Sequence, residues 1–82
     1  HHTMGTLYFQ RGMFREAVEA FARAAALDPA HPQAAFNLAL SLARDGDPCG
    51  GREVLVRASL QRPLAESAQR LLADLTSACG PR

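Results

Sequence analysis

Three histidines are the side chains best suited to metal chemistry, and their placement argues against a metal centre. His1 and His2 open the chain, whereas His31 stands between two loop-forming residues. A zinc site needs three or four His, Cys or acidic ligands at short spacings, and these histidines have no Cys or acidic partner at such a spacing. We predict no metal site and expect His31 to be a solvated residue between helices.

Catalytic carboxylates and nucleophiles are also poorly supported. Asp45 and Asp47 flank Gly46, and this arrangement is typical of a turn and a helix cap rather than of an acid–base pair. The sequence has no Gly-rich phosphate loop, no nucleophile elbow and no pairing of histidine with cysteine. We therefore predict no enzymatic activity, no catalytic residues and no cofactor.

The two cysteines pose a question about redox chemistry. Cys49 and Cys79 each lie about fifteen residues from Leu64, near which two helices are expected to turn back on each other. Both cysteines should then lie at the same end of adjacent antiparallel helices. A disulfide needs Cα atoms within about 7 Å, which is closer than typical helix axes, so only inward-facing side chains could join. We expect two free thiols and keep a bridge as the alternative.

The charge balance excludes some classes of partner. Nine arginines face eight acidic residues, which gives a formal net charge of +1. Such a balance gives no reason to expect a nucleic acid or an anionic membrane. The chain has no apolar run near the roughly 18–20 residues of a membrane span and no signal-peptide pattern. We predict no nucleic-acid partner, no membrane insertion and a cytoplasmic location, with the periplasm as the alternative.

The elements that must position these side chains recur along the chain. Sliding the sequence along itself aligns Gly12 with Gly46 and, at the same offset, Gly46 with Gly80. The other aligned identities are Glu19 with Glu53, Arg23 with Arg57, Ala24 with Ala58, Pro29 with Pro63, Ala34 with Ala68, Leu38 with Leu72, and Ala39 with Ala73. The matches need no gap and fall mainly at turns and at small or apolar helical positions. They predict an internal repeat.

Apolar residues at three-to-four spacing predict five helices with short turns between them. The first predicted helix precedes Gly12, the second spans Phe14 to Leu27, and the third runs from Pro32 to near Asp45-Gly46. The fourth runs from Pro48 and ends before Pro63, and the fifth runs from about Leu64 to a stop at Gly80-Pro81. Asp28-Pro29 should end the second helix, and Asp47 should cap the fourth. Short turns place neighbouring helices antiparallel, so we predict an all-α fold.

Two glycines fall inside the fourth helix. Gly50 and Gly51 each cost about 1 kcal/mol relative to alanine in a helix. Either Gly51 permits a close contact between helices or the segment 47–53 is a hinge. A hinge predicts early hydrogen exchange across that segment.

This pattern resembles the tetratricopeptide repeat, whose 34-residue unit pairs a helix A with a helix B. The first copy matches the family at Gly5, Tyr8, Gly12, Phe14, Ala17, Phe21, Ala24 and Pro29. The second copy keeps Leu38, Ala39, Gly46, Leu55, Ala58 and Pro63. It departs at Ala35 and Pro48, where aromatic residues are usual, and at Gly51, where a small alanine is usual.

The resemblance covers nearly the whole chain as about two and a half repeats. It implies a single domain, residues 1–82, folded as a short right-handed α-solenoid. The repeats would be residues 1–31 with a truncated helix A, residues 32–65, and a capping helix at 66–80. No comparable cap covers the first helix, so we predict that further N-terminal turns or a second copy cover Met4, Leu7 and Tyr8.

The resemblance also implies a function, because this family often holds peptides or helices in a concave groove lined by the A helices. The groove positions carried over by register are Thr6, Phe9, Gln10, Phe36, Asn37, Leu40, Arg44, Arg70 and Asp74. Phe9, Phe36 and Leu40 would form an apolar strip with Arg44 and Arg70 at its edges. The prediction is a protein-interaction module for another protein or peptide. Its alternative is a structural scaffold segment or homo-oligomerising piece of a larger array, in which the same residues are internal contacts.

Overall fold

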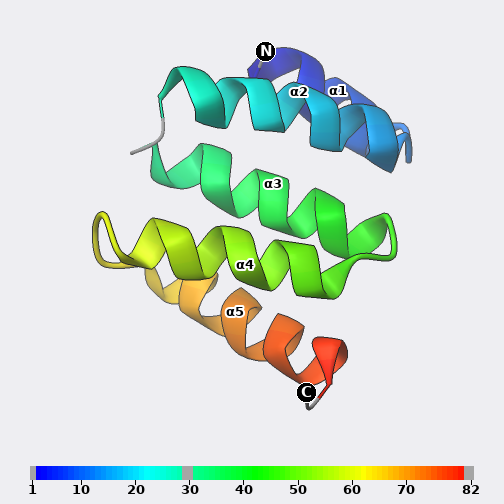
Figure 1. Ribbon diagram of the computed structural model, residues 1–82. Helices are drawn as coiled ribbons and strands as arrows, with labels where there is room; N and C mark the ends of the chain where they lie inside the picture. Colours follow the sequence, from blue (N-terminus) through cyan, green and yellow to red (C-terminus); the bar gives the residue numbers. More distant parts are fainter. Residues whose placement is uncertain (1, 29–30, 81–82) are drawn as a thin grey trace.

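The computed structural model describes residues 2–28 and 31–80, and it is built of helices stacked in chain order (Figure 1). They are α1 (His2–Gln10), α2 (Phe14–Leu27), α3 (Pro32–Arg44), α4 (Pro48–Ser59) and α5 (Glu66–Cys79). No strand occurs in the described part of the chain. The predicted all-α, five-helix fold is confirmed. His1, Pro29 and Pro81, which entered the predictions, lie outside the described residues.

The period of the repeat is visible in the backbone itself. Gly12, Gly46 and Gly80 have φ angles of 76°, 88° and 86°, a left-handed conformation that glycine adopts without steric cost. The amide of Met13 donates to the carbonyl of Tyr8 at 2.9 Å, and at the equivalent place in the second copy Asp47 donates to Leu42 at 2.8 Å. The turn between helices A and B therefore has the same backbone conformation in both repeats.

Helix ends follow the local signals in the sequence with one shift. Pro32 and Pro48 occupy the first turns of α3 and α4, and the Asp47 carboxylate accepts a hydrogen bond from the Gly50 amide at 2.9 Å. These are the predicted starts. Helix α5 begins at Glu66 rather than near Leu64, because Ala65 has an extended backbone with ψ of 160°.

The seam between α3, α4 and α5 depends on a glycine. A Cβ atom on Gly51 would lie 2.7 Å from the Ala39 carbonyl oxygen and 3.0 Å from a Leu75 methyl group. Real Cβ atoms essentially never approach as closely as the first distance, and the second would require the Leu75 side chain to shift, so glycine suits this close approach of α4 to α3. The arrangement favours the close-contact explanation of Gly51 over a hinge. Early exchange across 47–53 stays a prediction.

The expectation of two free thiols is wrong. Cys49 and Cys79 form a disulfide, with their Cα atoms 4.8 Å apart. The bond joins the first turn of α4 to the last turn of α5. Typical helix axes lie about 8–10 Å apart, but two inward-facing residues on closely packed helices approach much nearer. Gly51, two residues after Cys49, packs against the Ala39 backbone of α3 and a Leu75 methyl group of α5.

Packing is mostly between neighbours in the chain. Each helix contacts the next one, and α5 also reaches α3. The core at this end of the stack is formed by Ala39, Leu55, Ala68 and Leu75. Such nearest-neighbour packing is what a repeat array requires. The residue limits of the three repeats stay a prediction.

The outer face of α1 is less covered than the matching face of α3. Met4 and Leu7 are 49% and 46% exposed, whereas their counterparts in the second copy are the half-buried Leu38 and the fully buried Ser41. On α3, helix α2 packs on one side and α4 on the other. The cover predicted for α1 stays a prediction.

Candidate functional site

A hollow of about 170 Å³ lies between the two A helices, α1 and α3. We name it the α1–α3 hollow. Its lining residues are Thr6, Phe9 and Gln10 from α1, Asn37 and Leu40 from α3, and Phe21 from α2. Phe21 is buried and the others are half-buried or exposed. Register alone had assigned all of these residues except Phe21 to a groove, so the structure brings five of the nine candidates together.

Phe9 forms the aromatic wall of this hollow. Its ring packs edge-to-face against Phe14, with ring centroids 5.1 Å apart and an interplanar angle of 68°. The Arg44 guanidinium carbon lies 5.7 Å from the centroid of Phe9, within the range of a cation–π interaction. Arg44 thus connects the end of α3 to the wall contributed by α1. The α1–α3 hollow combines an apolar lining with a cation at its margin.

Polar groups at this hollow come from both helices. The Asn37 side-chain oxygen accepts a hydrogen bond from the Gln33 side chain at 3.1 Å, one helical turn earlier on α3. Gln10 is exposed and Thr6 is half-buried on α1. An extended peptide presents backbone donors and acceptors that amide side chains of this kind can satisfy.

The remaining candidates lie elsewhere. Phe36 packs against the core that contains Ala68 and does not line the α1–α3 hollow. Arg70 forms an exposed ion pair with Glu66 at 3.5 Å, and Asp74 is exposed farther along α5. The predicted apolar strip is therefore divided: Phe9 and Leu40 line one hollow, and Phe36 lines another.

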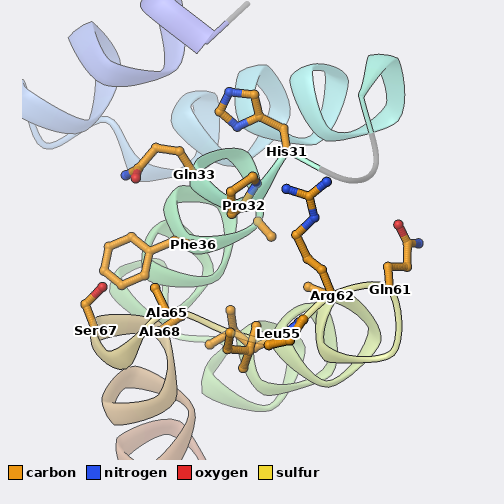
Figure 2. A pocket seen from close by; sticks show the side chains of 14 residues that line it. His31, Pro32, Gln33, Phe36, Leu55, Gln61, Arg62, Ala65, Ser67 and Ala68 are labelled. Carbon is orange, nitrogen blue, oxygen red and sulfur yellow. The ribbon is translucent and has the colours of Figure 1, made fainter.

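That second hollow, of about 150 Å³, lies among α3, α4 and α5. We name it the α3–α5 hollow. Figure 2 shows Leu55 at its base, Phe36 on one side above Ala68, and Arg62 on the opposite side. Sequence reasoning missed this site. The repeat gave a partial signal, because Leu55 stands at the position that Phe21 holds in the first copy, and each of the two residues lines a hollow.

His31 has a role that the sequence did not reveal. It is exposed, as expected, but its Nδ1 accepts a hydrogen bond from the Ala34 amide at 3.2 Å and so caps α3. The imidazole also stands at the margin of the α3–α5 hollow. Histidine is not among the preferred capping residues, which explains why a cap was not predicted.

Two further kinds of site, a metal centre and a membrane-spanning helix, were considered for the described residues. Within residues 2–28 and 31–80, no group of three or more His, Cys, Asp or Glu side chains could hold a metal ion. In the same part of the chain, no helix is long and apolar enough to cross a membrane.

Comparison with known proteins identifies the repeat. The family model described as TPR repeat, the tetratricopeptide repeat, matches residues 5–46, which is about half of the chain. The match includes residues 5–10 of α1 and the whole of α2 and α3, and it therefore contains all residues of the α1–α3 hollow. No curated protein matches the sequence.

Proposed function

The chain belongs to the tetratricopeptide repeat family, and from this premise we propose that it binds a segment of a partner protein in the α1–α3 hollow. Repeats of this family generally mediate contacts between proteins and are typically not catalytic. The observation that carries the proposal is the convergence of five candidate residues from two A helices on one hollow.

The chemistry of the hollow suggests what the segment looks like. Phe9 and Leu40 offer apolar surface for one or two side chains of a peptide or an amphipathic helix. Arg44 lies over the Phe9 ring and can attract a carboxylate next to those side chains. We therefore propose a segment with apolar anchors and acidic flanks. Arg70 and Asp74, on α5, would extend the contact only for a longer partner.

The test is a charge placed in the hollow. Leu40→Glu should abolish capture of partner proteins from extracts of the source cell, because a carboxylate there would be desolvated on binding. Leu27→Glu is the matched control, since Leu27 is 75% exposed at the end of α2 and does not line the hollow. Circular dichroism of both variants checks that the helices persist. Partners retained by a folded Leu40→Glu variant would contradict the proposal.

Exposed apolar residues on α1 favour a second candidate function. Met4 and Leu7 lie on a face that, on α3, is covered by a neighbouring helix. A scaffold or homo-oligomer would cover this face with another repeat or a second copy. Leu7→Glu should then lower the mass found by equilibrium sedimentation and leave capture through the α1–α3 hollow intact. A wild-type protein that is monomeric at all concentrations would contradict self-assembly.

The compartment is also a proposal. Disulfides are rare in the cytosol and persist in oxidising compartments. The Cys49–Cys79 bond therefore favours the periplasm, the alternative to the cytoplasmic location predicted from the sequence. Alkylation of free thiols in intact source cells, followed by mass spectrometry, tests this. Full alkylation of both cysteines would support the cytoplasm.

A further inference from the structure

The α3–α5 hollow has no assigned role, and its base is apolar. Leu55 is fully buried, and Ala35 and Ala68 are nearly so. Phe36 and Leu64 form half-buried walls. An apolar cavity of about 150 Å³ accommodates a group the size of a benzene ring. The space therefore suits one large apolar side chain from outside.

The margin of this hollow is cationic. Arg62 is an exposed lining residue with no salt bridge to any carboxylate among residues 2–28 and 31–80. No Asp or Glu of the described chain lines the hollow. Figure 2 shows the Arg62 side chain rising from the α4–α5 connection toward His31 and Pro32, across from Phe36. An incoming carboxylate would thus find a guanidinium and no carboxylate among the described side chains that line the hollow.

The position of Arg62 is fixed by the repeat. Its backbone amide donates to the Ala58 carbonyl at 3.2 Å, as Asp28 does to Ala24 at 3.1 Å in the first copy. Equivalent positions thus hold opposite charges in the two copies. Arg62 therefore favours a ligand carboxylate, whereas Asp28 at the equivalent position would disfavour one.

We propose that the α3–α5 hollow binds a partner segment in which a large apolar residue is followed directly by an acidic one. The apolar side chain enters between Phe36 and Leu64, and the carboxylate pairs with Arg62. This site is separate from the α1–α3 hollow, and the proposal does not depend on binding there.

Four probes separate the two contributions. They are acetyl-Gly-Leu-Asp-Gly-amide, the same peptide with Asn in place of Asp, the same peptide with Ala in place of Leu, and octanoate. Each is titrated at millimolar concentrations into the ¹⁵N-labelled protein, and the amide shifts of residues around the hollow are followed. The Leu-Asp peptide should give saturable shifts at Leu64 and Ala68. Loss of the leucine side chain should weaken binding by roughly tenfold or more. Replacing Asp by Asn should weaken it about two- to fivefold, the range of exposed ion pairs.

Variants identify the residues responsible. Arg62→Gln should weaken binding of the Leu-Asp peptide about two- to fivefold and leave the Leu-Asn peptide unaffected. Arg57→Gln is the control, because Arg57 pairs with Glu53 and does not line this hollow. Ala65→Leu, at an exposed lining position, should fill the space and remove binding of both peptides.

Four outcomes would overturn the proposal. The first is the absence of saturable shifts around the α3–α5 hollow. The second is equal affinity for the Leu-Asp and Leu-Asn peptides together with no effect of Arg62→Gln. The third is binding of octanoate without the Leu-Asp peptide, which would assign the hollow to a small amphipathic acid. Shifts confined to Phe9 and Leu40 would also reject this site while supporting the function proposed for the α1–α3 hollow.

Discussion

Helices α2 and α4 occupy equivalent places in successive repeats, yet different forces hold them. The residues at matching positions are Phe14, Ala17 and Phe21 on α2, and Pro48, Gly51 and Leu55 on α4. On α2, two aromatic rings fill the space beside α1, and one of them packs against Phe9. On α4, the rings are gone, the backbone approaches more closely and a disulfide joins the helix to α5. One backbone geometry can thus be stabilised by side-chain volume or by proximity and a covalent bond.

Each repeat has one glycine where helix A crosses helix B, but the glycine is on helix A in the first repeat and on helix B in the second. The first pair has Gly5 on helix A and the buried Ala17 on helix B. The second pair has Ala39 on helix A and Gly51 on helix B. A Cβ on Gly5 would lie 2.6 Å from the Phe21 ring, and one on Gly51 would meet the Ala39 backbone. Each repeat therefore keeps one glycine at the crossing, and the partner that fills the gap differs.

The comparison predicts the largest loss of stability on the aromatic side. Phe21→Ala should lower the free energy of unfolding by about 3–5 kcal/mol, because a buried ring is removed and no covalent bond supports α2. Urea unfolding followed by circular dichroism measures this. The control Leu27→Ala, at an exposed site, should change stability by less than about 0.5 kcal/mol. If Phe21→Ala lowered the free energy of unfolding by less than about 1 kcal/mol, aromatic side-chain volume would not be what stabilises α2.

Removal of the disulfide should have the next largest effect. For a loop of this length, Cys49→Ser with Cys79→Ser should cost about 3–4 kcal/mol. Hydrogen exchange should quicken on α5 and stay unchanged on α1 and α2. Wild-type protein with a dithiol reductant should behave like the double variant, whereas reductant should not affect the variant itself. An unchanged urea midpoint in the variant would mean that packing alone holds α5.

Gly50 and Gly51 test whether close packing of α4 against α3 requires glycine. Gly51→Ala should cost about 1–3 kcal/mol, because the strain against the Ala39 carbonyl outweighs the gain in helix propensity. Gly50→Ala is the matched control one residue away, where the added methyl meets only the movable Asp47 carboxylate. Its effect should stay within about 1 kcal/mol. Thermal unfolding compares the two, and equal midpoints would argue against close packing at Gly51.

The smallest expected difference concerns the starts of the two helices. Asp47→Ala should cost about 1 kcal/mol, since the Gly50 amide loses its acceptor. Met13, at the equivalent position of the first copy, precedes α2 without a side-chain cap, so Met13→Ala tests the same position without this effect. The two variants are compared by urea unfolding. A larger loss for Met13→Ala would show that apolar contact matters more than capping here.

Much of the fold could be predicted because its signals are local. Proline at Pro32 and Pro48, glycine at Gly12 and Gly46, and the apolar spacing between them act within a few residues. The disulfide could not be predicted, since it depends on the distance between α4 and α5, which tertiary packing sets. The apolar spacing was right for α5, but the extended backbone at Ala65 delayed its start.

Prediction of the candidate site was partial for the same reason. Register identified which residues face the gap between α1 and α3, because helical phase is a local property. It placed Phe36 in the same groove as Phe9 and Leu40, whereas Phe36 lines the α3–α5 hollow. The α3–α5 hollow depends on how α3, α4 and α5 pack together, and the role of Arg62 depends on which charges surround it in three dimensions.

The cross-link between Cys49 and Cys79 also divides the chain mechanically. A force applied to the two ends passes across the sulfur–sulfur bond, so residues 50–78 carry no tension while the bond is intact. The fully stretched chain is then about 100 Å shorter than its reduced form. Helices α1 to α3 are therefore the part that unfolds and lengthens under load, whereas most of α4 and α5 lies within the cross-linked loop and is not stretched.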